Sequence, residues 1–319
     1  MTTLINDRID LTGVHLETQL ERLGQEGLSR AKVNGAVLFQ GLSMETDDHL
    51  CRYAKSLLPS IRPYEGGLGY KRSVDGYVFT STEQPGFVTL TPHSELSYVP
   101  NPPRWIAFFC REAATKGGAT TLVDAQAVVR ALPEALVRDF HERGVCYERT
   151  YPNERPWMKA LNRRVRLLVS WQQAFQTTDA NRVSETCERL GIQYRWDDKK
   201  GLSITNTLPG VTQHPRLEQM TWTNQAHTFL MTPYNVGLLT WIAVSMVYWF
   251  PTFRQTHATF GDGSPIPNGH IDQVTKAVRA LQEPYDWKPG DALLLDNWAI
   301  LHGRLPFSGS RALFTATGS

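Results

Sequence analysis

Hydrophobic and polar positions follow two different periods along the chain. Near the start, Leu16, Leu20 and Leu23 repeat at the i, i+4, i+7 spacing of an amphipathic helix, and a short apolar run at 36–41 predicts a strand. From residue 77 onward, short runs rich in β-branched and aromatic residues are separated by proline and glycine, which is typical of strands joined by turns. These runs are 77–80, 87–90, 105–111, 120–123, 146–151, 292–295 and 312–316.

The order of these segments favours one fold class. Residues from about 154 to 216 alternate charged helical pieces, such as 179–190, with loops, so strands lie on both sides of a helical or loop insertion. A doubly wound sheet would show strands alternating with helices throughout, so we expect an antiparallel barrel or jelly roll closed by distant segments. Because no repeat or linker marks a boundary, we expect one domain over 1–319, with a helical N-terminal part at about 1–60.

Composition and charge exclude several classes of protein. The 319 residues are 41% hydrophobic and 20% charged, an ordinary balance that argues against a disordered chain. The net charge is +2 and no basic block is present, so we expect no nucleic-acid partner. The cysteines are far apart and form no Cys-x-x-Cys pair, and the N-terminus has no signal-peptide pattern. We therefore expect free thiols and a cytoplasmic protein.

One uncharged segment needs a separate interpretation. No charged residue occurs from 219 to 253, and 236–250 is nearly all apolar. The apolar part is shorter than the roughly 20 residues that a membrane-spanning helix needs, and Pro233 and Pro251 bracket it. We expect no membrane span here but a buried helix. A wall of an apolar pocket, or a contact that forms a homo-oligomer, is the alternative.

Two short patterns offer metal ligands. His93 and Glu95 follow an apolar run, and side chains two residues apart on an extended segment point the same way. His302 follows a second apolar run near the C-terminus. Two histidines and one carboxylate suit Fe(II) oxygenases, although the same set also suits catalytic zinc. Without further information, a surface His-x-Glu pair and a turn histidine would be the commoner explanation of these residues.

Further motifs occur around these residues in a fixed order. They are YVFTSTE at 77–83, HSELSY at 93–98, GGATT at 117–121, GDGSPI at 261–266 and HGRLPF at 302–307, followed by Arg311. From about residue 32 to its end, the sequence resembles the TauD/TfdA family of Fe(II)/2-oxoglutarate dioxygenases, in its SyrP-like and clavaminate synthase-like branch. The resemblance implies a mainly β fold with helical insertions around a double-stranded β-helix core (a jelly roll of the cupin type).

The resemblance also implies the cofactors and the residues that bind them. The cofactors are Fe(II), 2-oxoglutarate as cosubstrate, and O₂. His93, Glu95 and His302 match the iron ligands of the family. Arg311 matches the arginine that pairs with the distal carboxylate of 2-oxoglutarate, a role that suits the two parallel donors of a guanidinium. Thr120 matches a threonine that helps hold this carboxylate, although a strand threonine often packs only through its methyl group.

Several other residues are weaker candidates for substrate binding. Tyr98 ends the motif of the first two ligands. Asn297 precedes His302 by five residues and is a candidate for a substrate contact, a support of the metal site or a simple turn. Arg304 is a candidate for the substrate site or for a brace of the turn after His302. Residues 62–83 have the composition of a lid, in which Lys71 and Arg72 could receive a carboxylate or simply face solvent.

The expected activity is hydroxylation of an unactivated C–H bond in an amino-acid-derived substrate or a small natural-product intermediate, free or tethered to a carrier protein. Desaturation or epoxidation with the same cofactors is the first alternative. A non-catalytic metal-binding jelly roll and a zinc hydrolase are the others. Thr315 stands where sulfonate-using relatives carry a second arginine, which argues against a sulfonate substrate. Glu95 fills the position that related halogenases leave open for chloride, so halogen transfer is disfavoured.

Overall fold

Strands from distant parts of the chain form the core of the molecule. The computed structural model describes residues 3–69, 71–163, 168–248 and 255–319. Among these, seven strands form a large sheet in the order β1-β2-β16-β6-β19-β3, in which β4 also pairs with β19. Their bounds are β1 (Arg8–Asp10), β2 (Ala36–Gln40), β3 (Ile61–Arg62), β4 (Phe79–Thr80), β6 (Trp105–Glu112), β16 (Ala292–Asp296) and β19 (Ala312–Gly318).

A smaller sheet packs on the large one and completes the jelly roll. Its order is β15-β8-β17-β5, and its strands are β5 (Leu90–His93), β8 (Thr120–Asp124), β15 (Glu283–Tyr285) and β17 (Ile300–Arg304). Apolar side chains of both sheets share one core cluster, to which the large sheet contributes Phe108 and Leu295 and the small sheet Leu122 and Ile300. The predicted fold class, a mainly β chain with helical insertions around a jelly-roll core, is confirmed.

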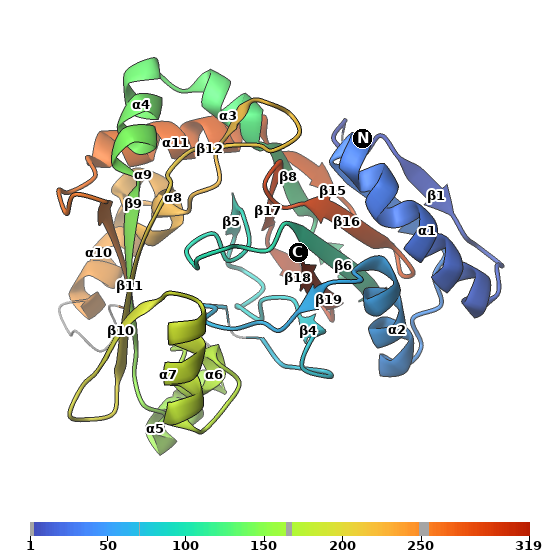
Figure 1. The fold of residues 1–319 in the computed structure, drawn as a ribbon, viewed down its shortest axis with the longest axis horizontal. Coiled ribbons are helices and arrows are strands. Elements are labelled where there is room, and N and C mark those ends of the chain that lie inside the picture. The colour runs from blue at the N-terminus through green and yellow to red at the C-terminus, as the bar shows by residue number, and fades with distance from the viewer. Residues whose placement is uncertain (1–2, 70, 164–167, 249–254) are drawn as a thin grey trace.

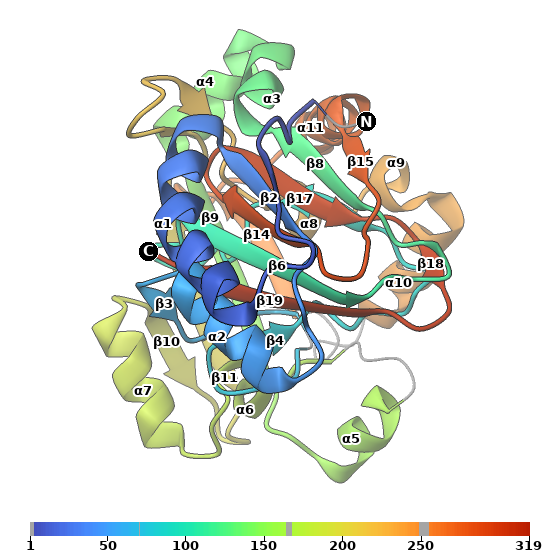
Figure 2. The same cartoon turned by 90° about the vertical axis from the view of Figure 1, so that its right-hand side faces the viewer.

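The N-terminal helices cover the other face of the large sheet. Figure 2 shows α1 (Leu16–Asn34) and α2 (Asp47–Leu57) lying over this sheet, and Leu23, Phe39 and Leu50 belong to the core cluster between them. The helix α1 ends at Gly35, whose φ of 77° is a left-handed conformation that glycine adopts without strain. The helix α2 begins after Thr46, whose hydroxyl accepts a hydrogen bond from the backbone N–H of His49.

A third sheet lies on the opposite side of the molecule from α1 and α2 (Figure 1). Its order is β10-β11-β9-β14, and its strands are β9 (Val145–Tyr151), β10 (Gln193–Trp196), β11 (Leu202–Leu208) and β14 (Thr256–Phe260). The expectation of only helices and loops at 154–216 is therefore wrong. This part contains α5 (Pro156–Asn162), α6 (Trp171–Ala174) and α7 (Ala180–Arg189). It also contains two strands of the third sheet, because β11 pairs with β9 and β10 pairs with β11.

The remaining elements connect and cover these sheets. They are α3 (Ala125–Ala131), α4 (Glu134–Arg143), α8 (Ala226–Phe229), α9 (Pro233–Val236), α11 (Asn268–Leu281), and the two-residue pairs β7 (Lys116–Gly117) with β18 (Phe307–Ser308) and β12 (Thr212–Gln213) with β13 (Met220–Thr221).

The uncharged segment forms the helix α10 (Leu238–Tyr248). The predicted burial is wrong for its described side chains, because Leu238, Leu239, Ile242 and Met246 are 59%, 83%, 43% and 64% exposed. The helix lies at the edge of the molecule, away from the jelly-roll sheets (Figure 1). The end of the predicted stretch, 249–250, lies outside the described residues. No helix in the described ranges is long and apolar enough to cross a membrane.

Candidate metal and cosubstrate site

Pairing between two antiparallel strands brings His93 and His302 together. His302 of β17 lies directly opposite His93 of β5, so both side chains project from the same face of the small sheet. Their ring centroids are 4.9 Å apart. Gly303 permits this close pairing, because a Cβ atom there would lie 2.4 Å from the carbonyl oxygen of Leu90. The run at 87–90 is not the predicted strand: β5 begins only at Leu90, and Phe87 is exposed.

A turn after β5, rather than an extended segment, directs Glu95 to the two imidazoles. Leu96 has a φ of 54°, a left-handed value that is uncommon for leucine. The side chain of Asn297, which is fully buried, holds this turn: Oδ1 accepts a hydrogen bond from Glu95 N–H at 2.7 Å, and Nδ2 donates to the Glu95 carbonyl at 3.0 Å. Asn297 therefore fixes the Glu95 backbone beside the loop that leads into β17 and His302.

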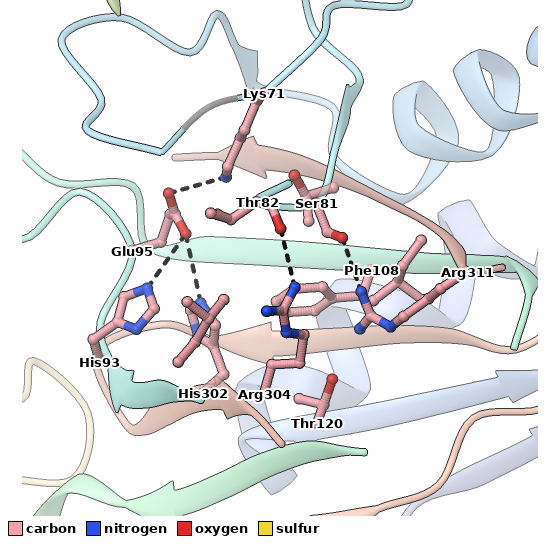
Figure 3. Close-up of a pocket in the computed structure, with 14 residues that line it drawn as sticks. Lys71, Ser81, Thr82, His93, Glu95, Phe108, Thr120, His302, Arg304 and Arg311 are labelled. Atoms are coloured by element: carbon pink, nitrogen blue, oxygen red, sulfur yellow. Dashed lines mark hydrogen bonds and ion pairs between the residues drawn. The ribbon is translucent and has the colours of Figure 1, made fainter. Parts of the chain in front are cut away.

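The three side chains form a cluster with the composition of a metal site. Their potential ligand atoms all lie within 4.8 Å of one another. Glu95 Oε2 is 3.6 Å from His302 Nε2 and 3.8 Å from His93 Nε2 (Figure 3). His93 Nδ1 donates a hydrogen bond to the Thr91 carbonyl at 2.8 Å, which leaves the lone pair of Nε2 directed at the cluster. His302 Nε2 is buried and has no hydrogen-bond partner among the described residues.

Burial and neighbouring charges set the protonation of the cluster. Burial alone would raise the pKa of Glu95, but the Lys71 ammonium and the two histidines hold this pKa well below its ordinary value. Burial lowers the pKa of His302 to about 4. An ionised carboxylate and a neutral imidazole are the forms that bind a metal ion, so the residues present fit a divalent cation.

A second group of residues lies beside this cluster, between the two sheets. Arg311 donates a hydrogen bond to Ser81 Oγ at 3.1 Å, and no carboxylate of the described residues pairs with it. Burial, together with the charge of Arg304, lowers the pKa of Arg311 to about 10, so the guanidinium is still cationic at neutral pH. Thr120 Oγ1 accepts a hydrogen bond from Trp287 Nε1 at 2.8 Å, so its own hydrogen is available to another acceptor. Arg311 and Thr120 line one cavity with the three cluster residues.

Arg304 braces a loop. Its two terminal nitrogens donate to the carbonyl oxygens of four residues of the loop that precedes β5, namely Thr82, Gln84, Pro85 and Val88. The structure thus places Arg304 in the wall of the cavity that Arg311 and Thr120 line, and places Asn297 beside Glu95, where its amide contacts backbone.

A larger cavity of about 390 Å³ opens on the other side of His93 and Glu95. Tyr98 lines it, and its hydroxyl accepts a hydrogen bond from Leu68 N–H at 2.9 Å. Arg72 does not line this cavity; its side chain is 70% exposed and pairs with Glu83 at 2.7 Å. Other lining residues are apolar or carry neutral polar groups, such as Leu68, Phe229, Met231, Gln84, Gln225, His227 and Asn235.

Sequence reasoning missed the partners that hold the site residues in place. The sequence around Trp287 does not indicate its contact with Thr120, because 167 residues separate the two. Lys71 was expected at most to receive a carboxylate from a substrate, yet its Nζ lies 3.1 Å from Glu95 Oε1. A lysine within a loop-like segment gives no indication of burial.

Comparison with known proteins agrees with this geometry. Residues 4–317 match the model of the family described as taurine catabolism dioxygenase TauD, TfdA family. The chain belongs to the TauD/TfdA family. It is an Fe(II)- and 2-oxoglutarate-dependent oxygenase, as the resemblance in its motifs indicates.

Two relatives and one solved structure are similar to this chain over most of their lengths. The dapdiamide synthesis protein DdaC of Enterobacter agglomerans is 28% identical over 88% of this chain and 81% of its own. A clavaminate synthase-like protein of Arabidopsis thaliana is 26% identical over 89% and 81%. An asparagine oxygenase structure with Fe(II), 3-hydroxyasparagine and succinate has a TM-score of 0.55 at 10% identity, and covers 98% of this chain and 93% of that one. At this identity, the structural likeness shows the shared fold alone.

Proposed function

We propose that this TauD/TfdA-family oxygenase hydroxylates an unactivated C–H bond of an amino-acid-derived substrate or a small natural-product intermediate. His93, Glu95 and His302 bind the iron, and Arg311 and Thr120 bind the distal carboxylate of 2-oxoglutarate. The observation that carries the proposal is the cluster of two imidazoles and one carboxylate within 4.8 Å, in the same cavity as a partly buried arginine that no described acid pairs with.

Each residue of the metal cluster has a defined task in this proposal. His93 and His302 offer neutral nitrogens, and Glu95 offers Oε2, so three protein ligands leave three positions of an octahedral ion for other groups. Bound iron supplies the activation of O₂, coupled to decarboxylation of 2-oxoglutarate to succinate and CO₂, for oxidation of the substrate. Phe108 packs against His302 with ring centroids 5.1 Å apart and limits the access of water to this side of the cluster.

Arg311 and Thr120 orient the cosubstrate. A guanidinium partly buried between two sheets forms charge-assisted hydrogen bonds that are stronger than those in water, and it recognises a carboxylate with two parallel donors. Thr120 adds a hydroxyl donor, because Trp287 already donates to its oxygen. The small cavity between these residues and the metal cluster is lined by Leu90, Phe108 and Leu313, which suit the methylene groups of 2-oxoglutarate.

The cavity of about 390 Å³ is the proposed substrate site. It adjoins His93 and Glu95, and its neutral amides and aromatic rings suit an amino-acid-derived molecule that carries amide or hydroxyl groups. The relative that is named for dapdiamide synthesis supports a small natural-product intermediate as the substrate. The same cavity would admit a substrate tethered to a carrier protein.

Two further parts of the proposal concern the cell and the assembly. The four cysteines are free thiols, which supports a reducing compartment such as the cytoplasm. The exposed apolar residues of α10, with Leu239 as the most exposed, support a contact between copies of the chain.

The test begins with Fe(II) and 2-oxoglutarate under anaerobic conditions. We expect a weak visible charge-transfer band, which Zn²⁺ does not produce. Succinate release is then screened over amino acids, their amides, dipeptides and carrier-bound aminoacyl groups, and the product is weighed by mass spectrometry. A gain of one oxygen supports hydroxylation, and a loss of two hydrogens indicates desaturation instead. The absence of the band and of any succinate would refute the proposal.

A further inference from the structure

Lys71 is a buried lysine in direct contact with the proposed metal site. Its side chain is 3% exposed, and Nζ lies 3.1 Å from Glu95 Oε1 and 4.2 Å from the centroid of the Tyr64 ring. Lysine is almost never fully buried unless it is paired, because removing an ammonium from water costs free energy. The partner here is the one carboxylate of the metal cluster, so the contact bears on how this carboxylate binds.

The two oxygens of Glu95 face different groups. Oε1 faces the ammonium of Lys71, whereas Oε2 faces the two imidazoles at 3.6 and 3.8 Å. Figure 3 shows Lys71 reaching the carboxylate from the side opposite to His93 and His302. Asn297 fixes the backbone of Glu95 with two hydrogen bonds, so the residue is held at both ends. A carboxylate held in this way cannot rotate freely to offer both oxygens to one ion.

Resting on the proposed role of Glu95 as an iron ligand, we propose that Lys71 is a positioning residue that holds Oε1 and thereby makes Glu95 bind the metal through Oε2 alone. Binding through one oxygen matters because the metal has a limited number of coordination positions. Two histidines and one carboxylate oxygen leave three of six positions, the number that bidentate 2-oxoglutarate and O₂ require. A second oxygen from Glu95 would take one of these positions and compete with 2-oxoglutarate.

A purely structural role for Lys71 would be to anchor the segment 62–83 to the core. The chain offers a matched control for this alternative in Arg72, the next residue. Arg72 also forms an ion pair, with Glu83 at 2.7 Å, but this pair lies within the segment and the Arg72 side chain is 70% exposed. Loss of either ion pair would remove a contact of this segment, whereas only loss of the Lys71 pair would free an oxygen of Glu95.

The experiment compares Lys71→Met and Arg72→Met with the wild type under anaerobic conditions. One readout is the visible absorption of the Co(II)-loaded protein, which changes with coordination number. The other is the affinity for 2-oxoglutarate, taken from a titration of the Fe(II) charge-transfer band. We expect Lys71→Met to change the Co(II) spectrum and to weaken 2-oxoglutarate binding roughly 10- to 100-fold, the range for partners that orient metal ligands. Arg72→Met should match the wild type in both readouts.

Unchanged Co(II) spectra and unchanged 2-oxoglutarate affinity in Lys71→Met would overturn the proposal, as would equal losses in Lys71→Met and Arg72→Met. If Lys71→Met does not unfold cooperatively on heating, Lys71→Arg and Lys71→Gln take its place: the cationic variant should bind 2-oxoglutarate more tightly than the neutral one, and equal affinities would contradict the proposal. A wild type without the Fe(II) band would refute the proposed function, whereas the Co(II) spectra would still test Lys71.

Discussion

The two ends of the site differ in how the protein treats its buried charges. At the metal end, the Glu95 carboxylate has a counter-ion within the protein, because Lys71 lies 3.1 Å from Oε1. At the proposed cosubstrate end, Arg311 is partly buried, but Ser81 is the one side chain with which it forms a described hydrogen bond, and no described carboxylate pairs with it. The protein supplies a counter-ion for Glu95, and it leaves Arg311 without an acidic partner among the described residues, as the proposed binding of a 2-oxoglutarate carboxylate would require.

Arg304 shows that burial alone does not produce this difference. It is 4% exposed and belongs to the same cavity as Arg311, yet its donors reach four backbone carbonyls of the loop 82–88. Backbone carbonyls are dipoles that satisfy a guanidinium without neutralising it, so Arg304 stiffens the wall and also adds positive charge. Together, the two arginines favour a dianionic cosubstrate.

The largest effect is expected at the metal end. His93→Ala, Glu95→Ala and His302→Ala should each abolish Fe(II)-dependent succinate formation, because each removes one of three metal ligands. Bound iron after dialysis and succinate formation are the measurements, and cooperative thermal unfolding shows that the fold persists. His270→Ala, which lies outside both cavities, is the control. Near-wild-type activity in one of the three variants would remove that residue from the ligand set.

In a second experiment, alanine variants of Arg311 and Arg304 should show different defects. Arg311→Ala should weaken 2-oxoglutarate binding by about 2–5 kcal/mol, since it removes a charge-assisted contact and leaves a carboxylate unpaired, while iron binding changes little. Arg304→Ala should instead lower the free energy of unfolding by about 2 kcal/mol, because four partly buried carbonyls lose their donor. The measurements are a 2-oxoglutarate titration and chemical denaturation. If both variants lose 2-oxoglutarate affinity equally at unchanged stability, the distinction between clamp and brace is wrong.

The residues of the site could be predicted from the sequence to different degrees. The resemblance of several motifs to the family identified His93, Glu95 and His302 as a set, whereas the apolar runs beside them left a surface pair and a turn histidine open. The pairing of His93 with His302 depends on the register of β5 against β17, which no local pattern encodes. The Lys71 contact depends on how an irregular segment folds over the site. The exposure of α10 was predicted wrongly, because an apolar pattern implies burial but does not say whether the fold covers it.

Replacement of Asn297 tests whether the hydrogen bonds to the Glu95 backbone matter as much for metal binding as the Lys71 counter-ion does. Asn297→Ala removes hydrogen bonds to Glu95 N–H, the Glu95 carbonyl and the Pro103 carbonyl, all in a buried place. We expect the free energy of unfolding to fall by about 2–4 kcal/mol, and metal affinity to fall roughly tenfold, because the turn that carries Glu95 is released. Denaturation and Co(II) titration measure the two effects. A stability loss with unchanged metal affinity would show that Lys71 alone suffices to place the carboxylate.

The smallest effect is expected at Thr120, and a neighbouring threonine provides its control. Thr120→Val keeps the shape of the side chain but removes the hydroxyl that accepts from Trp287 and faces the cosubstrate cavity. We expect 2-oxoglutarate binding to weaken by about 1 kcal/mol, or roughly fivefold, the usual worth of one neutral hydrogen bond. Thr121, the next residue of β8, is 1% exposed, and its hydroxyl has no hydrogen-bond partner among the described residues. Thr121→Val should therefore leave 2-oxoglutarate affinity unchanged and should not reduce stability.

The variant Trp287→Phe separates two roles of the Thr120 hydroxyl, which accepts a hydrogen bond from Trp287 and is proposed to donate one to the cosubstrate. This variant removes the indole donor and keeps the hydroxyl, which is then free to rotate. If the indole holds the hydroxyl hydrogen toward the cosubstrate, Trp287→Phe should weaken 2-oxoglutarate binding by less than Thr120→Val does, but in the same direction. Equal 2-oxoglutarate affinities in Thr120→Val, Thr121→Val and the wild type would mean that Thr120 packs only through its methyl group and that Arg311 binds the carboxylate without it.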